Sequence, residues 1–341
     1  VIVFFVISGY LVGGAALAEF LKNGDLQLSR YLLRRGARLY TVLIPALMIG
    51  AALDIAGSRL SGGSSVYADT LHHLSVTGFL GNLVFLQTLF VETFGSNDAL
   101  WSLTNEFFYY LMCGLGLYAL SKNRSRMQRI ALFVLLAGIA WLIFPKILLF
   151  GTLWLLGMAI RVMPLRRTLP LLIATGQFLL VMVAIRLFFE WEWRAQLPAH
   201  YAVSAIAALS FALLVASLQA RPMHDSSKLP LLVRHPFNRF AADFSYTLYA
   251  THFPFIMFVI AASETLFGWG WHSSYSGDGE LLLALLLVSA TMVYAWLMFL
   301  AFESRTRQVY EWLKHGLQRL QGMLQRQPQS KDAALGQVNQ A

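Results

Sequence analysis

The sequence of 341 residues is poor in charged residues and holds a single cysteine. Charged side chains make up 13% of it, whereas about 25% is usual for soluble domains. Hydrophobic residues reach 57% and the mean hydropathy is +0.60, which excludes a large soluble core and predicts a chain that crosses a membrane several times. Cys113, the only cysteine, can form no internal disulfide. It lies in an apolar run and is interpreted as a packing residue, with a catalytic thiol as the alternative.

Nine apolar runs are long enough to cross a membrane, or nearly so. They predict an all-α fold, a polytopic transmembrane helical bundle. A further run, residues 78–91, is predicted to be a re-entrant or interfacial segment that does not cross. The nine runs are residues 1–21, 39–56, 100–120, 129–144, 147–163, 168–189, 200–219, 244–263 and 281–302.

The net charge of +9 is concentrated in short segments between the apolar runs. This is the positive-inside pattern of membrane proteins and does not indicate nucleic-acid binding. If residues 78–91 do not cross, 22 of the 26 Lys and Arg residues fall on one side. We therefore expect a multi-pass protein of the inner (plasma) membrane with a cytoplasmic C-terminus. Residues 1–303 form the expected membrane domain, and residues 304–341 a cytoplasmic basic helix with a polar tail.

Residues 100–110 carry a carboxylate, Glu106, one to two turns into an apolar run. A charged side chain that faces lipid costs about 2.5 kcal/mol or more, so such groups usually face the interior of a bundle. At helical spacing Ser102, Glu106 and Tyr110 share one face, and Asn105 lies beside them. The pattern predicts a functional polar centre. A carboxylate held in a purely structural network is the alternative.

Basic residues follow the first apolar run. Arg34 and Arg38 are one turn apart on a helix, and Arg35 is next to them. Guanidinium groups in this arrangement can grip phosphates, bind anionic lipid, or only fix the orientation of the protein in the membrane. The residues alone leave these alternatives open.

Ser245, Tyr249 and His252 fall on one face of a later apolar run, and Pro254 follows them. An imidazole carries protons near neutral pH, so His252 is a candidate to orient a hydroxyl group or to transfer its proton. A satisfied structural histidine is the alternative. Because His252 and Glu106 are both costly in lipid, we expect them to face one shared cavity.

Two local patterns predict packing and capping. Gly9 and Gly13 have the GxxxG spacing that lets membrane helices approach closely. Asn97 and Asp98 are expected to cap the helix that begins near Trp101. No set of His, Cys, Asp and Glu residues has chelating spacing, so no metal site is predicted.

Three ordered stretches resemble the integral-membrane acyltransferase-3 family, the O-acyltransferases that acetylate bacterial surface sugars. Residues 101–109 (WSLTNEFFY) are similar to the family's WSLxxExxY signature. Residues 4–11 (FFVISGYL) are similar to its FFVISGFL run, and residues 245–254 (SYTLYATHFP) to its SYxLYxxHFP run. Residues 34–40 and 302–303 are weaker matches. The resemblance covers essentially the whole chain.

The resemblance implies transfer of an acyl group, most often acetyl, from acetyl-CoA or another acyl-CoA to a hydroxyl of a surface or exported glycan such as lipopolysaccharide. Family members open with a helix that carries a basic residue and a catalytic His. This sequence starts downstream of that helix, so we expect it to be missing. The expected roles are donor binding by Arg34, Arg35 and Arg38, catalysis by Glu106, Tyr249 and His252, and shaping of the substrate cavity by Ser8, Trp101 and Asn105.

Two other classes of protein fit parts of the sequence. A transporter or flippase for a lipid-linked glycan also has polar residues and Gly- or Pro-interrupted spans, although no inverted repeat is evident. A purely structural membrane subunit leaves Glu106 and His252 without a role. The expected partners are membrane lipid and a glycan acceptor, with no nucleic acid.

Overall fold

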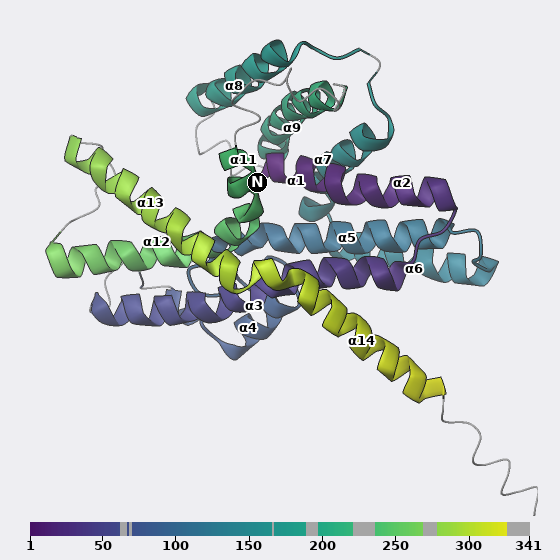
Figure 1. The fold of residues 1–341 in the computed structure, drawn as a ribbon, viewed down its shortest axis with the longest axis horizontal. Coiled ribbons are helices and arrows are strands. Elements are labelled where there is room, and N and C mark those ends of the chain that lie inside the picture. Colours follow the sequence, from purple (N-terminus) through teal and green to yellow (C-terminus); the bar gives the residue numbers. More distant parts are fainter. Residues whose placement is uncertain are drawn as a thin grey trace, which may run out of the picture.

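The computed structural model is an all-α bundle, as predicted (Figure 1). It describes residues 1–61, 67, 70–165, 167–188, 197–220, 236–268 and 278–325. The helices are α1 (Ile2–Ser8), α2 (Gly14–Asn23), α3 (Leu28–Leu60), α4 (Val76–Leu83), α5 (Trp101–Leu120), α6 (Arg126–Leu142), α7 (Lys146–Val162), α8 (Leu171–Phe188), α9 (Leu197–Gln219), α11 (Pro236–Asp243), α12 (Ser245–Phe267), α13 (Asp278–Ala301) and α14 (Thr306–Gln325). A π-helical turn, η1 (Gly9–Gly13), joins α1 to α2.

Each of the nine predicted apolar runs coincides with a helix, but nine crossings are not confirmed. In the described ranges, six helical segments are long and apolar enough to cross a membrane, or up to seven if a bent pair is counted as one span. That pair is α6 and α7, which meet at an angle of 115°. The apolar runs 129–144 and 147–163, predicted as two spans, therefore form either one broken span or a re-entrant loop. The helical class is confirmed and the count of nine is not.

Helix α3 is longer than the apolar run that predicts it. It begins at Leu28, so Arg30, Arg34 and Arg38 lie on the helix instead of in a connection over residues 22–38. Leu and Arg are good helix formers, so the helix begins well before the apolar run of residues 39–56. The first turns of α3 therefore hold these guanidinium groups at fixed positions on a rigid element.

Helix α3 is packed between other parts of the bundle. It lies along α12 and also contacts α5 and α14. Tyr31 of α3 is next to Gly114 of α5, and Arg35 lies over the ring of Tyr110, so α3 and α5 are antiparallel. In Figure 1, α14 leaves the bundle from the same end of α3 that carries the arginines. We call this the basic end, and the opposite end, which holds residues 70–100, the loop end.

The loop end contains the segment predicted not to cross. Helix α4 has eight residues, about 12 Å of helix, which is far less than the roughly 30 Å of a bilayer core. Ser75 caps it by accepting a hydrogen bond of 2.9 Å from the Gly78 amide. Asn82 then fastens the following turn, because its side chain donates to the Glu92 carbonyl (2.8 Å). None of the described helices that are long and apolar enough to cross a membrane includes residues 78–91, in line with the prediction.

The predicted cap of α5 is wrong. Asn97 donates its side-chain amide hydrogen to the carbonyl of Ala250 in α12 (2.8 Å), and Asp98 accepts from the Thr93 hydroxyl (2.7 Å). A short 3-10 turn, Asp98–Leu100, leads into α5, which has no side-chain cap. A partner from a distant helix has replaced the local one, and Asn97 ties the loop end to α12.

The small residues of α1 and η1 allow the close packing that their spacing predicts. A Cβ atom on Gly9 would overlap the backbone carbonyl of Trp154 in α7, and one on Gly13 would overlap the Trp154 ring. From the other side, a Cβ atom on Gly157 would overlap the carbonyl of Val6. The backbones of α1 and α7 are therefore in direct contact, which fixes the position of Ser8.

Replacing Gly9 by Ala is expected to lower the free energy of unfolding by about 1–3 kcal/mol, because overpacking forces the two helices apart. Gly138→Ala in α6 is the matched control, since nothing lies within 4 Å of its added Cβ. Thermal unfolding in detergent measures both variants. Equal melting temperatures for the two would contradict the close crossing of α1 and α7.

Candidate functional site

Glu106 is buried in the middle of the bundle, with only 3% of its surface exposed. The hydroxyl of Ser8 in α1 donates to its Oε1 atom (2.9 Å), and the hydroxyl of Tyr110, one turn further along α5, donates to the same oxygen. A carboxylate removed from water needs such donors, because an unpaired buried charge costs several kcal/mol or more. The predicted face of Glu106 and Tyr110 is present, and Ser8 joins it from another helix.

Ser8 is itself held in place by Trp154 of α7, whose indole Nε1–H donates to the Ser8 hydroxyl (3.1 Å). The Ser8 hydroxyl therefore accepts from the indole and donates to Glu106 at the same time. Three helices therefore meet at this hydroxyl: α1 through Ser8, α5 through Glu106 and α7 through Trp154. The π-helical turn η1 follows Ser8 directly and packs on Trp154.

Two of the predicted arginines belong to the same centre. Arg35 lies 5.9 Å from the ring centroid of Tyr110, and Arg38 lies 5.4 Å from that of Tyr246. Both are close enough to Glu106 to act on it electrostatically. Arg35 and Arg38 are about 70 residues before Glu106 in the sequence. The antiparallel packing of α3 and α5 brings this part of α3 beside the part of α5 that carries Glu106 and Tyr110.

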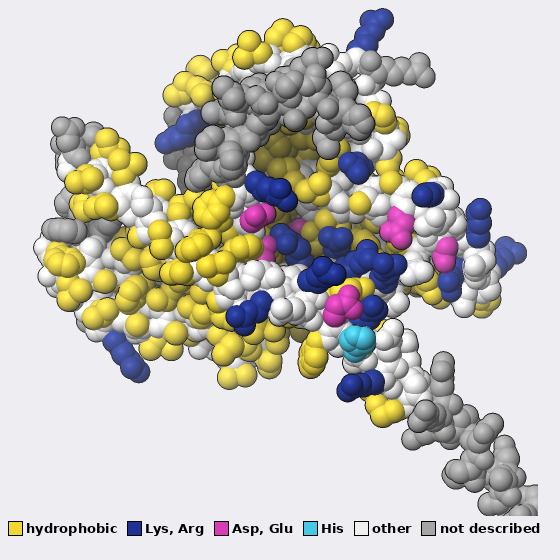
Figure 2. Space-filling view, in the orientation of Figure 1, with side chains coloured by type: hydrophobic (Ala, Val, Ile, Leu, Met, Phe, Trp, Pro, Cys, Tyr) yellow, Lys and Arg dark blue, Asp and Glu magenta, His cyan; other side chains and the backbone are white. Residues whose placement is uncertain are grey.

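Arg34 is directed elsewhere. Its guanidinium lies over the ring of Tyr310 in α14, 5.9 Å from the centroid. The three arginines predicted to act together are thus divided, with Arg35 against Tyr110, Arg38 against Tyr246 and Glu303, and Arg34 against α14. In Figure 2, Lys and Arg side chains gather around a hollow where the first half of α3 meets α14.

Glu303 is a second buried carboxylate, and the sequence shows it only as a weak match to the family. Its Oε1 atom lies 3.0 Å from Arg38, and its Oε2 accepts from the backbone amide (3.2 Å) and the hydroxyl (2.5 Å) of Thr247. Because Thr247 is in the first turn of α12, Glu303 satisfies a helix N-terminus as well as a guanidinium. In the sequence, the only other sign of this buried carboxylate is that Glu303 directly follows the apolar run of residues 281–302.

Tyr249 connects α12 to the start of α5. Its hydroxyl donates to the carbonyl of Ala99 (2.7 Å), so the hydroxyl of Ser102, 2.6 Å away, donates to Tyr249. The ring of Phe4 stacks on it, with 6.0 Å between the ring centroids. Tyr249 is therefore next to the polar face of α5, one turn from Glu106.

His252 lines a groove of about 420 Å³ between α12 and α13, together with Ser245 and Tyr249. The three residues share one face, as predicted. The Nδ1 atom of His252 lies 3.0 Å from the Leu248 carbonyl and 2.9 Å from that of Tyr249, so Nδ1–H is the donor there. Glu106 is not part of this groove, so the structure does not place the two side chains in it together. Tyr249 lies between them.

The remaining predicted cavity residues, Trp101 and Asn105, both precede Glu106 on α5. Trp101, at the start of α5, packs edge-on against Phe5 and lines a pocket of about 740 Å³ at the loop end. Asn105 is buried and donates to the hydroxyl of Tyr109 (3.4 Å), away from the Glu106 carboxylate. Trp101 is thus open to a pocket, whereas Asn105 supports a neighbouring side chain.

These features define a polytopic helical membrane protein with a buried polar centre of carboxylates, hydroxyls and guanidinium groups. Comparison with protein-family models matches residues 1–302 to the acyltransferase domain of the acyltransferase-3 family. The match covers most of the chain, so the protein belongs to this family and is a membrane acyltransferase, as the three sequence stretches predict. No curated protein and no solved structure matches the chain.

Glu303→Gln is expected to lower the free energy of unfolding by about 1.5–3 kcal/mol, because Arg38 and the first turn of α12 lose a charged partner. Glu19→Gln, at an exposed position of α2, is the control and should change it by less than about 0.5 kcal/mol. Thermal unfolding in detergent compares the two. A wild-type melting temperature for Glu303→Gln would show that the buried pair contributes nothing.

Proposed function

We propose that this acyltransferase moves an acetyl group from acetyl-CoA to a hydroxyl group of a surface or exported glycan. The observation that carries the proposal is the buried carboxylate of Glu106, whose hydrogen-bond donor Tyr110 lies against Arg35, with Arg38 one turn further along α3. Acyl transfer to a hydroxyl needs a group that takes a proton and cationic groups that neutralise the donor's phosphates. This centre supplies both within one site.

The donor fits the basic side of the centre. Acetyl-CoA carries phosphates, and guanidinium groups bind phosphate oxygens in pairs of parallel hydrogen bonds. Arg35 has a buried Nε–H that finds no acceptor among the described residues. Arg38 shares its charge with Glu303 and remains about half exposed, at 49%. Both are therefore able to contact an anionic donor that reaches α3 from the basic end.

The reaction we propose is direct transfer. The acceptor hydroxyl gives its proton to Glu106, and its oxygen forms a bond to the thioester carbonyl carbon. The C–S bond then breaks, and the coenzyme thiolate leaves and takes up a proton. Tyr249 and Ser102 hold the start of α5 beside this centre, and His252 orients the acceptor or carries the proton away.

The acceptor fits the loop end. The pocket beside Trp101 also contains Phe90, Asp98 and an ion pair between His73 and Glu92, whose Nε2 and Oε2 atoms are 2.6 Å apart. Aromatic rings offer flat apolar faces, and carboxylates accept hydrogen bonds from hydroxyl groups. This combination suits a sugar, and Trp101 is less than two turns from Glu106 on the same helix.

Transfer of label separates an enzyme from a transporter. Membranes that contain the protein are incubated with acetyl-CoA labelled in the acetyl group, and the glycan fraction is counted. We expect label in the glycan. Movement of glycan across the membrane without label would instead support a flippase and contradict the proposal.

In the same assay Glu106→Gln is expected to lower the transfer rate by about 10²–10⁴-fold, because the amide cannot accept the hydroxyl proton. Donor binding should stay close to that of the wild type, since Arg35 and Arg38 are unchanged. Glu19→Gln on the surface of α2 serves as control. Full activity of Glu106→Gln would remove the carboxylate from the mechanism.

The proposed site requires the basic end to face the cytoplasm, where acetyl-CoA is made. In a Cys113→Ser background, Asn123→Cys at the basic end and His72→Cys at the loop end should label with an impermeant thiol reagent from opposite sides. We expect Asn123→Cys to react only from the cytoplasmic side. Labelling of both positions from one side would refute this orientation.

A further inference from the structure

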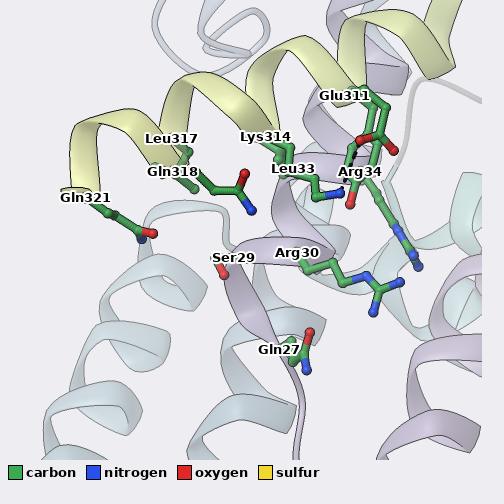
Figure 3. A pocket seen from close by; sticks show the side chains of 11 residues that line it. Gln27, Ser29, Arg30, Leu33, Arg34, Glu311, Lys314, Leu317, Gln318 and Gln321 are labelled. Atoms are coloured by element: carbon green, nitrogen blue, oxygen red, sulfur yellow. Dashed lines mark hydrogen bonds and ion pairs between the residues drawn. The ribbon is translucent and has the colours of Figure 1, made fainter.

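A polar pocket of about 500 Å³ lies between the start of α3 and α14. Figure 3 shows side chains of both helices turned towards it, with Lys314 and Gln318 extending from α14 towards α3. The α14 half lies beyond residue 302, outside the region that matches the family. The pocket is separate from the buried centre around Glu106.

Positive charge dominates this pocket. Arg30 and Arg34 are one turn apart on α3, and Figure 3 shows their guanidinium groups on the same side of the helix. Lys314 adds a third cation from α14. Glu311 is the one acidic residue of the described lining, and it is engaged by Lys314 at 3.2 Å.

The neutral groups of the pocket are hydrogen-bonding ones. Gln27, Ser29, Gln318 and Gln321 line it together with the three cations. Amide and guanidinium donors around a small open volume suit a compact anion with several acceptor oxygens, and the forked guanidinium geometry matches phosphate. An apolar peptide or an acyl chain would leave these donors without partners.

One stripe of α3 leads from the pocket towards the buried centre. Arg30, Arg34 and Arg38 follow one another at intervals of four residues, so Arg30 and Arg38 are about 12 Å apart along the helix axis. Arg38 is the residue that reaches both Glu303 and the surroundings of Glu106. An elongated anionic ligand that begins in the pocket is therefore guided along α3 to the buried carboxylate.

We propose that this pocket binds the 3′-phosphate at the nucleotide end of the acyl-CoA donor, so that α14 completes the donor site. The inference rests on the proposed function, because it takes acyl-CoA as the donor. In this arrangement Arg30, Arg34 and Lys314 hold the phosphomonoester, and the flexible pantetheine arm extends along α3 towards Arg38 and Glu106. A phosphomonoester also occurs on phosphatidic acid, so the test distinguishes the two sources.

The test compares acetyl-CoA with acetyl-3′-dephospho-CoA as donors for the chain of 341 residues in detergent. For the wild type, the KM of the dephospho donor should be at least about tenfold higher, as expected when a contact to a charged group is lost. Lys314→Ala and Arg30→Gln should raise the KM of acetyl-CoA by about tenfold and change that of the dephospho donor less than about twofold.

Arg319→Ala is the matched control. Arg319 is nine residues from Tyr310, which places it about 180° away on α14 at about 100° per residue, and it is not part of the pocket lining. It carries the same charge on the same helix, so its replacement should leave both KM values unchanged. Equal effects of Arg319→Ala and Lys314→Ala would show a general charge effect and overturn the pocket.

The two proposals fail in different ways. If acetyl-CoA is a donor but the wild type does not distinguish it from the dephospho form, the pocket assignment is overturned and the acyltransferase function stands. Binding of adenosine 3′,5′-bisphosphate, measured by calorimetry, gives a readout without activity, and Lys314→Ala should weaken it about tenfold. Displacement of this probe by vesicles containing phosphatidic acid, without donor discrimination, would assign the pocket to lipid and refute the coenzyme.

Discussion

The structure depends on keeping one carboxylate, that of Glu106, away from both water and lipid. In an apolar bundle such a group is tolerated only with donors of its own. Ser8 and Tyr110 supply them, and Trp154 positions Ser8 in turn. The requirement explains why α1 and α7 touch at their backbones, since only glycine at position 9 lets the Ser8 hydroxyl come this close.

A second buried carboxylate, that of Glu303, also has partners of its own. Arg38 pairs with Glu303, and Arg35, on the same helix, lies against Tyr110, which donates to Glu106. Glu303 in turn fastens the first turn of α12 through Thr247. The charged groups therefore link α3, α5 and α12 in one network.

The two ends of the bundle differ in chemistry, and the proposed function makes use of this difference. The basic end carries a pocket with three cations between α3 and α14, and the loop end carries a pocket with Trp101 and an ion pair. Glu106 lies between the two. A donor and an acceptor that come from opposite sides of a membrane would meet at this carboxylate without either having to cross.

The sequence by itself determined the helical membrane class, the family and the burial of Glu106, because hydropathy, ordered motifs and the cost of a charge in lipid are local properties. It also determined that Gly9 and Gly13 serve close packing. It did not determine the partners. The residues joined by the Ser8–Glu106 hydrogen bond are 98 positions apart, and the pairing of Arg38 with Glu303 spans a longer separation still. Only the tertiary structure decided these contacts, and likewise sent Arg34 to α14 and Asn97 to α12. The physical reason is that apolar helix faces are nearly alike in lipid, so which helices lie side by side depends on packing throughout the bundle.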